Sequence, residues 1–314
     1  AREPQDSSFQ LLTSMLYLVT GGAGFIGHHL VERLLRDGHQ VRVLDNLSTG
    51  KRERIPQGAE FFELDFTKLD EIRPAFVGVD GVFHVGALPR ILFSIEYPIE
   101  SFQANTFGTL NVLVAARDAG VKRVVYSGSS SAYGNTETLP NRPDMPANPM
   151  NPYALQKYNS ELLIKQFSDI YGLETVILRY FNVYGPGMAD SGTYLTVISV
   201  FARQRKAGEP LTIHGDGEQS RDFTYVYDAV DANVRAMESD SVGHGEVLNV
   251  GGGRNFTVNY IASIFGGSVE RKEGRKAEAR HTLSDISKTK ELLGWEPSVR
   301  FEDGLRETIK WFGL

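Results

Sequence analysis

The sequence of 314 residues contains no cysteine, which excludes disulfide bonds, thiolate metal sites and cysteine nucleophiles. It has no excess of basic residues either, because 33 Lys and Arg stand against 39 Asp and Glu, and the net charge of −6 argues against nucleic acid as a partner. No run approaches the roughly 18 apolar residues of a membrane span. We therefore expect a cytoplasmic protein that binds neither nucleic acid nor a membrane.

The first residues of the chain differ from the rest. Residues 1–14 show no periodicity and no apolar core of a signal peptide, and they precede Met15, so we interpret them as a leader or tag outside the fold. The rest is long enough for two domains or one large α/β unit with an appendage. A hydrophobic content of 41% can support an ordinary buried core.

The stretch from Tyr17 to Gly27 joins a short apolar run to a glycine-rich turn and then to a helical pattern. Its G-x-x-G-x-x-G spacing is set by three glycines: Gly21, Gly24 and Gly27. Such a turn lets the backbone approach a pyrophosphate, whose charge the helix N-terminus favours. A second apolar run, residues 40–44, ends at Asp45, where a carboxylate can accept from a ribose 2′-hydroxyl and would repel a 2′-phosphate. Together these features predict an NAD site.

Short apolar runs alternate with amphipathic patterns along the chain, which is typical of a doubly wound parallel sheet, a Rossmann fold. Further strands are expected at residues 60–64, 81–85, 123–127, 175–180, 211–214 and 246–250. Helices are expected at residues 99–119, 153–171, 194–207, 285–293 and 301–312. Five prolines mark residues 139–152 as a loop, and residues 269–280 are rich in charge.

The pattern changes after Gly185, where loops and short elements replace the regular alternation. The apolar run at residues 246–250 then returns to the main sheet. We therefore predict a Rossmann domain of residues 15–185 plus about 224–255. A smaller, interleaved α/β substrate-binding domain would contain residues 186–223 plus about 256–314.

Tyr153 and Lys157 lie four residues apart on one expected helix and therefore share a face. An ammonium near a phenol favours the phenolate and lowers its pKa, so this tyrosine could act as a base near neutral pH. The pair follows the fifth strand, and Ser127–Ser131 lies at the carboxyl end of that strand, where open α/β sheets bind ligands. A serine hydroxyl there could bind the substrate oxygen whose proton the tyrosine takes.

These motifs together resemble the extended short-chain dehydrogenase/reductase family, and within it the nucleotide-sugar epimerases. The resemblance runs from Met15 to the C-terminus and rests on Gly21–Gly27, Asp45-Asn-Leu47, Ser129, Tyr153, Lys157, Arg179-Tyr-Phe-Asn-Val-Tyr-Gly-Pro186, Gly215-Asp-Gly217, Arg221-Asp-Phe223 and Leu293-Gly-Trp-Glu-Pro297. It implies inversion at C4 of a UDP-hexose through a 4-keto sugar, with tightly bound NAD as a regenerated redox cofactor. It also implies a homodimer formed through the helices near residues 99–119 and 153–171.

The resemblance also implies roles for individual residues. The catalytic residues would be Ser129, Tyr153 and Lys157. The NAD-binding residues would be Gly21, Gly24, Phe25, Ile26, Gly27, Asp45, Asn46, Asp65, Phe66, Val85, Gly86, Ala87, Ser127, Tyr153, Lys157 and Tyr180. The residues that bind the UDP-sugar would be Ser129, Asn182, Thr212, His214, Arg221, Arg275 and Glu278. Two guanidinium groups among them suit the oxygens of a diphosphate.

Several positions bear on which substrate is used. Ser131 stands near the point where similar dehydratases and decarboxylases carry an acid, so the sequence favours simple epimerisation. Arg90 and Phe93 are unusual in a loop where many epimerases have small residues, and Arg90 could accept a uronate carboxylate. Gly187, in contrast, stands where uronate epimerases often have an arginine, and Gly86 replaces a more usual alanine.

Three functional hypotheses therefore stay open: a UDP-hexose 4-epimerase, a UDP-glucuronate 4-epimerase or other sugar-modifying relative, and a catalytically idle dinucleotide sensor. The intact set of Ser129, Tyr153 and Lys157 argues against the sensor. Thr282 falls near a position where narrow-pocket 4-epimerases carry a tyrosine. A smaller residue there would leave room for an N-acetyl group beside C2 of the sugar.

Overall fold

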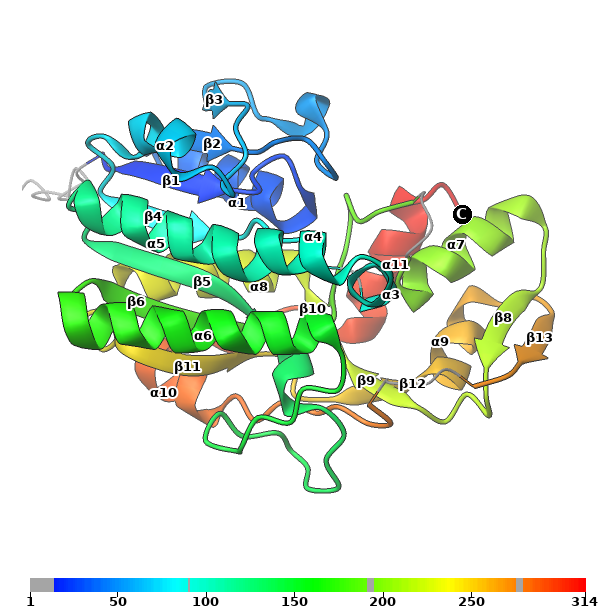
Figure 1. Cartoon of the computed structure of the whole chain (residues 1–314). Coiled ribbons are helices and arrows are strands. Elements are labelled where there is room, and N and C mark those ends of the chain that lie inside the picture. Colours follow the sequence, from blue (N-terminus) through cyan, green and yellow to red (C-terminus); the bar gives the residue numbers. More distant parts are fainter. Residues whose placement is uncertain (1–13, 90, 191–194, 275–278) are drawn as a thin grey trace, which may run out of the picture.

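The central sheet has seven strands, and each strand is parallel to its neighbours (Figure 1). The computed structural model describes residues 14–89, 91–190, 195–274 and 279–314. In spatial order the strands are β11 (His244–Val250), β6 (Glu174–Tyr180), β5 (Arg123–Ser129), β4 (Gly81–His84), β1 (Leu16–Thr20), β2 (Gln40–Leu44) and β3 (Glu60–Phe62). The order steps outward from β1 in both directions, so the predicted doubly wound fold is confirmed. The reversal between β1 and β4 is where such sheets bind ligands.

Helices cover both faces of the sheet because successive residues of a strand point to opposite sides. Val19 packs in one hydrophobic cluster and its neighbour Leu18 in the other. The Val19 face is covered by α1 (Phe25–Arg36), α8 (Val226–Glu238) and α10 (Ser287–Leu293). The Leu18 face is covered by α2 (Leu69–Ile72), α5 (Gly108–Asp118) and α6 (Pro152–Tyr171), of which α5 and α6 run side by side in Figure 1.

A smaller unit with its own hydrophobic cluster lies beyond the carboxyl ends of the strands (Figure 1). Its elements are α7 (Val197–Ala207), β8 (Leu211–His214), α9 (Val258–Phe265), β13 (Val269–Lys272) and α11 (Phe301–Trp311). Two short pairs of strands connect this unit to the central sheet. In one, β10 (Thr224–Tyr225) pairs with β7 (Val183–Tyr184), and in the other, β12 (Asn255–Thr257) pairs with β9 (Ser220–Asp222). Leu293 and Trp295 pack instead in the cluster of the Val19 face. The predicted domain boundaries stay a prediction.

The expected helix at residues 99–119 is wrong in detail. The structure has α4 (Pro98–Phe102), a π-helical turn η3 (Gln103–Phe107) and α5, so the hydrogen-bond register shifts in the middle. The loop expected around Phe93 is the helix α3 (Ile91–Glu96), and the sequence analysis also missed α8, α9 and β13. The short helical turns are η1 (Arg52–Arg54), η2 (Arg73–Phe76) and η4 (Ser130–Tyr133).

Several element ends also differ from expectation. The third strand stops at Phe62, and β4 stops at His84, which leaves Val85 outside the strand. In contrast, β5 continues to Ser129, two residues further than expected. These shifts matter because the predicted site residues stand at the strand ends.

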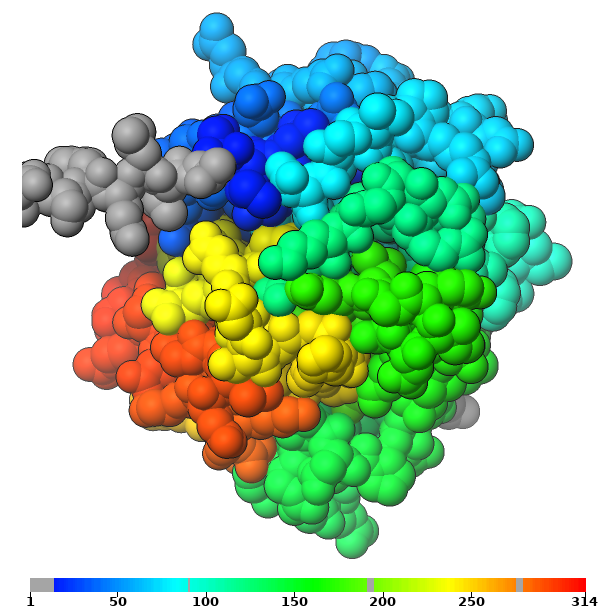
Figure 2. Space-filling model, turned by 90° about the vertical axis from the view of Figure 1, so that its left-hand side faces the viewer, coloured from blue at the N-terminus to red at the C-terminus, as the bar shows by residue number. Residues whose placement is uncertain are grey.

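The amino ends of the strands form the face seen in Figure 2, where segments from the start, middle and later parts of the chain lie side by side. Arg123, the first residue of β5, holds neighbouring segments together at this end of the sheet. Its buried guanidinium donates to the carbonyl oxygens of Ala236, Met237, Ser239 and Val242 and pairs with Glu174 at 2.6 Å. The opposite, carboxyl end of the sheet is left to face the smaller unit.

Candidate active site

The glycine-rich turn after β1 has the shape of an anion cradle. Gly21 adopts a φ of 68°, a conformation that L-residues with side chains rarely adopt, and its N–H donates to the Leu44 carbonyl over 2.8 Å. A Cβ on Gly27 would lie only 2.1 Å from the Gly21 carbonyl oxygen, so helix and turn touch through backbone alone. Gly24 is the N-cap of α1, and it has no side chain that could accept from the N–H groups of the first turn. These free donors and the helix dipole suit a pyrophosphate.

Asp45, at the carboxyl end of β2, is held in place by two backbone donors. The N–H groups of Ala23 and Leu47 donate to its two oxygens over 3.0 and 2.8 Å. Burial raises the pKa of the Asp45 carboxyl, and these two hydrogen bonds oppose that effect. The carboxylate therefore stands beside the glycine turn, as the predicted ribose contact requires.

Two further residues predicted to bind the adenine half of the cofactor lie next to Asp45. The Asn46 amide donates to Asp65 over 3.2 Å, and the Thr67 N–H donates to the same carboxylate over 2.8 Å. Burial alone would raise the pKa of Asp65, but these hydrogen bonds outweigh burial and lower it. The structure thus brings Asn46 and Asp65 together at the ends of β2 and β3.

Gly86 has a steric explanation. A Cβ at this position would lie 2.7 Å from the ring of Phe66, which also fills the space over Gly108. The more usual alanine at this position would therefore displace the Phe66 ring. Gly86 also packs against the turn, because a Cβ on Gly21 would lie 2.6 Å from the Gly86 Cα. Val85, Gly86 and Ala87 thus follow β4 directly at the switch point of the sheet.

The serines at the end of β5 are ordered by hydrogen bonds. The hydroxyl groups of Ser129 and Ser131 lie 2.8 Å apart, and the Ser131 N–H donates to Ser129 Oγ over 3.2 Å. Two residues before Ser129 on the same strand, the hydroxyl groups of Ser127 and Tyr180 lie 3.0 Å apart. The Tyr180 hydroxyl is in turn held by Asn233 of α8.

Tyr153 and Lys157 occupy the first two turns of α6, whose N-cap Asn151 accepts from the Ala154 N–H over 2.9 Å. The Tyr153 N–H donates to Ser94 of α3 over 3.0 Å. Lys157 is only 3% exposed, and its Nζ lies 4.3 Å from the centroid of the Tyr126 ring on β5. The helix α6 packs on β5 and on η4 (Ser130–Tyr133), which we call the serine turn.

Burial dominates the electrostatics of Lys157. It lowers the pKa of the ammonium to about 7, against the attraction of Glu161, which raises it. His84 of β4 lies behind this region, fully buried between the hydroxyl groups of Thr20 and Thr109 at 2.7 and 2.9 Å. Burial, together with the charge on Lys157, lowers the pKa of His84 to about 3, so the imidazole is neutral. The sequence analysis did not single out His84.

Asn182 and Arg221, predicted to bind the diphosphate of the substrate, meet through Asp222. The Asn182 amide donates to the Asp222 carbonyl over 2.7 Å, and Asn182 has a φ of 32°. Arg221 donates to the carbonyl oxygens of Ser220 and Arg280. Thr282 is 9% exposed, and its hydroxyl accepts from the Asp222 N–H over 3.2 Å. These three predicted residues therefore form one group around β9.

Asp222 itself is a residue that the sequence analysis missed. Its buried carboxylate accepts from the N–H groups of Gly252 and Gly253, after β11, and from the N–H and hydroxyl of Ser284. Burial raises the pKa of Asp222 to about 6 despite these four donors. An acid between Arg221 and Phe223, next to apolar strand residues, was the available signal for such a buried link.

Two further predicted substrate residues, Thr212 and His214, belong to β8. The Thr212 side chain accepts from Gln204 over 2.7 Å, and the His214 ring lies 2.9 Å from the Glu273 carbonyl, at the end of the β8–β13 pair. Arg90, Arg275 and Glu278 lie outside the described residues.

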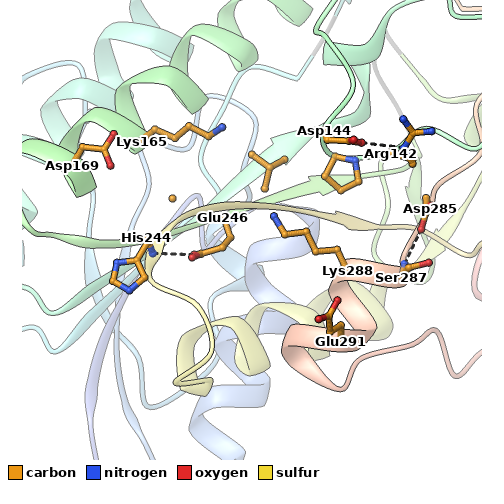
Figure 3. Close-up of a pocket in the computed structure, with 13 residues that line it drawn as sticks. Arg142, Asp144, Lys165, Asp169, His244, Glu246, Asp285, Ser287, Lys288 and Glu291 are labelled. Carbon is orange, nitrogen blue, oxygen red and sulfur yellow. Dashed lines mark hydrogen bonds and ion pairs between the residues drawn. The ribbon is translucent and has the colours of Figure 1, made fainter.

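A separate cleft of about 680 Å³ lies at the amino end of the edge strand β11 (Figure 3). Charged side chains of both signs line it, including Lys165 and Asp169 of α6 and Lys288 and Glu291 of α10. None of the predicted site residues contributes to it. Within the described ranges, no cluster of His, Asp and Glu could hold a metal ion, and no helix is long and apolar enough to cross a membrane.

Comparisons with known proteins agree with this geometry. Residues 17–251 match the model of the NAD dependent epimerase/dehydratase family. The UDP-glucose 4-epimerase of Mycolicibacterium smegmatis is 34% identical over 95% of this chain and 98% of its own length. The UDP-glucuronate 4-epimerase of Thermodesulfobacterium geofontis is 34% identical over 94% of this chain and 95% of its own length.

Solved structures give the same result. The UDP-glucose 4-epimerase of Thermotoga maritima, solved with UDP-glucose, superposes with a TM-score of 0.91 at 37% identity and covers 95% of this chain and 99% of its own. A UDP-N-acetylglucosamine 4-epimerase of Methanobrevibacter ruminantium reaches 0.89 at 36%, covering 95% and 98%. The Thermus thermophilus UDP-glucose 4-epimerase in complex with NAD reaches 0.88 at 35%, covering 95% and 99%.

The chain therefore belongs to the NAD dependent epimerase/dehydratase family, and within it to the enzymes that act on UDP-sugars. Its cofactor is NAD. The turn made by Gly21, Gly24 and Gly27 fits this assignment, because the lack of a side chain at Gly27 lets the start of α1 pack directly on the backbone of the turn.

Proposed function

We propose that this enzyme inverts C4 of a UDP-hexose, interconverting UDP-glucose and UDP-galactose through a transient 4-keto sugar. One observation carries the proposal. Tyr153 and the buried Lys157 lie on one face of α6, a helix that packs on β5, whose last residue Ser129 has its hydroxyl group held by Ser131. This set provides a base, a cation that stabilises its phenolate and a donor for the sugar hydroxyl.

In the proposed mechanism, Ser129 binds the O4′ hydroxyl and Tyr153 removes its proton. Lys157 stabilises the phenolate and binds the ribose of the cofactor. NAD, when bound, supplies the hydride acceptor that takes hydrogen from C4′ and returns it. Asn182, Arg221 and Arg275 would hold the diphosphate, so that the 4-keto sugar can turn and be reduced on its other face. Thr212, His214 and Glu278 would bind the nucleoside.

The residues assigned to NAD would divide along the strand ends. The glycine turn with Phe25 and Ile26 would hold the pyrophosphate, and Asp45 and Asn46 the adenosine ribose. Asp65 and Phe66 would contact the adenine. The nicotinamide half would lie along the ends of β4, β5 and β6, at Val85, Gly86, Ala87, Ser127 and Tyr180.

The alternative substrate is a uronate. The relative from Thermodesulfobacterium geofontis acts on UDP-glucuronate at the same 34% identity as the UDP-glucose enzyme of Mycolicibacterium smegmatis. An idle dinucleotide sensor is disfavoured because it would not need the ordered Ser129, Tyr153 and Lys157. The absence of cysteine is consistent with a cytoplasmic location.

We also propose a homodimer through α4, η3 and α6. Large apolar side chains are exposed on these elements: Ile99, Phe102, Phe107, Leu155 and Leu162. Because these elements pack against one another, their exposed apolar side chains favour an interaction surface. Light scattering after size-exclusion chromatography should give twice the mass of 34.8 kDa, and Leu155→Glu together with Leu162→Glu should give the monomer.

The function is tested by incubating the purified protein with UDP-glucose, UDP-galactose, UDP-glucuronate and UDP-N-acetylglucosamine and separating the products by chromatography. Tyr153→Phe keeps the ring and removes the phenol, so turnover should fall by about two to four orders of magnitude while NAD stays bound. Near wild-type turnover in this variant would exclude Tyr153 as the base. Conversion of UDP-glucuronate alone would replace the hexose assignment.

A further inference from the structure

Two oppositely charged side chains are buried where α6, the helix of the proposed base, packs on β6. Arg179 of β6 donates to both oxygens of Glu161 of α6, over 3.0, 3.1 and 2.7 Å. Glu161 is 1% exposed and Arg179 is 3% exposed. Taking two charges out of water costs several kcal/mol each by general estimates, so such a pair is weak evidence for stability alone. Its place in the fold suggests a role in the site.

Glu161 continues the helical face that bears the proposed base. Tyr153, Lys157 and Glu161 are spaced by four residues, so they follow one another on three successive turns of α6. The Glu161 carboxylate also lies against the backbone of β5, since a Cβ on Gly128 would be 3.2 Å from its Oε1. Gly128 separates Ser127 from Ser129, and it pairs with Arg179 in the sheet.

Arg179 extends the contact toward the serine turn. Its guanidinium carbon lies 4.6 Å from the centroid of the Tyr133 ring, in the turn η4 that follows Ser129. The Tyr133 hydroxyl donates to Asn249 of β11 over 2.6 Å. The pair therefore links α6, β5, β6 and the serine turn at one point.

The groups that face Lys157 come from three elements. They are Glu161 on α6, Tyr126 on β5 and His84 on β4, while Tyr153 stands one helical turn before Lys157 on α6. His84 is neutral, and burial raises the pKa of the Tyr126 phenol well above its usual range, so that group is neutral as well. Among these groups, Glu161 is the one that carries a carboxylate.

We propose that Glu161, fixed by Arg179, is a positioning residue that keeps Lys157 protonated and placed beside Tyr153. Glu161 does not touch the sugar or NAD in this proposal and acts only through Lys157. The inference rests on the proposed function, because it assigns a partner to the lysine of the same site. A purely structural role for the pair would leave the pH dependence of catalysis unchanged.

The first test is the pH profile of kcat/KM for Glu161→Gln. Without the carboxylate, Lys157 should lose its proton at lower pH, so the alkaline limb should move down by about one pH unit. Activity at pH 9 should then fall about tenfold, while activity near about pH 5, where Lys157 stays protonated in both proteins, changes little. Glu174→Gln is the matched control, because Glu174 pairs with Arg123 at the amino ends of β6 and β5, whereas Arg179 stands near the carboxyl end of β6. It should leave the limb in place.

A double variant keeps the test valid if Glu161→Gln does not fold. Glu161→Gln with Arg179→Met removes both charges, so no unpaired guanidinium remains buried. It should show the same shift of the alkaline limb. An unchanged limb in a folded variant, or a loss of activity by one factor at every pH, would overturn the proposal.

A titration without substrate separates this inference from the proposed function. Tyrosinate absorbance at 295 nm, measured as the difference between each protein and its Tyr153→Phe counterpart, reports the pKa of Tyr153. That pKa should rise in the double variant, because a neutral Lys157 no longer favours the phenolate. If the wild type converts no UDP-sugar, the proposed function fails and this titration still decides the role of Glu161. An unchanged Tyr153 pKa overturns the inference.

Discussion

Replacing Gly27 by alanine tests whether the glycine turn holds NAD as its shape indicates. The new Cβ would stand 2.1 Å from the Gly21 carbonyl oxygen and 2.8 Å from the Gly22 Cα. Real Cβ atoms essentially never come within 3.0 Å of another heavy atom, so helix and turn must separate by about 1 Å. Because both neighbours are backbone, no side-chain rotation relieves the contact.

The expected magnitude follows from the cost of overpacking, about 1–3 kcal/mol. If this cost falls on the geometry that binds the pyrophosphate, the affinity for NAD drops by roughly 5-fold to 150-fold. Gly24→Ala is the graded control, because its Cβ would lie 3.1 Å from the same oxygen and a small adjustment suffices. Its loss of affinity should stay below about fivefold.

The assay is calorimetric titration of NAD into protein stripped of nucleotide, with thermal unfolding followed in parallel. A lower melting temperature with an unchanged affinity for NAD would show that the strain destabilises the fold without changing the NAD site. Wild-type affinity in a folded Gly27→Ala variant would refute the reasoning that this backbone contact shapes the site.

The remaining predictions concern cofactor choice and pocket size. Denaturing the purified protein should release NAD rather than NADP, because the Asp45 carboxylate would repel a 2′-phosphate; mostly NADP would show that Asp45 has another role. Thr282→Tyr should lower kcat/KM for UDP-N-acetylglucosamine more than for UDP-glucose, since a ring there would fill the space beside C2 of the sugar. A wild type that converts UDP-glucose but not the acetylated sugar would refute the open pocket, and a ratio that Thr282→Tyr leaves unchanged would show that Thr282 does not line the pocket.

The Rossmann half could be predicted from the sequence because its signals are local. The glycine turn, Asp45 at a strand end and the alternation of apolar runs each depend on a few consecutive residues. The helix α8 was missed although nine of its 13 residues are buried, because its hydrophobic pattern lies in a stretch where the expected fold had already changed character. The π-helical turn at Gln103–Phe107 could not be anticipated, since it depends on tertiary packing against α6.

The substrate side depends on contacts between distant segments. Asp222 joins loops about 30 and 60 positions away through Gly252 and Ser284, and Thr282 reaches the same point through its hydroxyl group. No local pattern encodes these pairings. A motif match can place Asn182 and Arg221 on the substrate side, but only the fold shows that both meet at β9.

The Glu161–Arg179 pair, however, was accessible from the sequence by a physical argument. Arg179 interrupts the apolar run of β6, a central strand buried on both faces, where an unpaired guanidinium would be too costly. A buried acid must therefore face it, and α6 packs on that strand. The helical spacing from Tyr153 through Lys157 leads to Glu161 on the following turn. The spacing of four residues that separates the proposed base from its lysine thus also places a carboxylate one helical turn after the lysine.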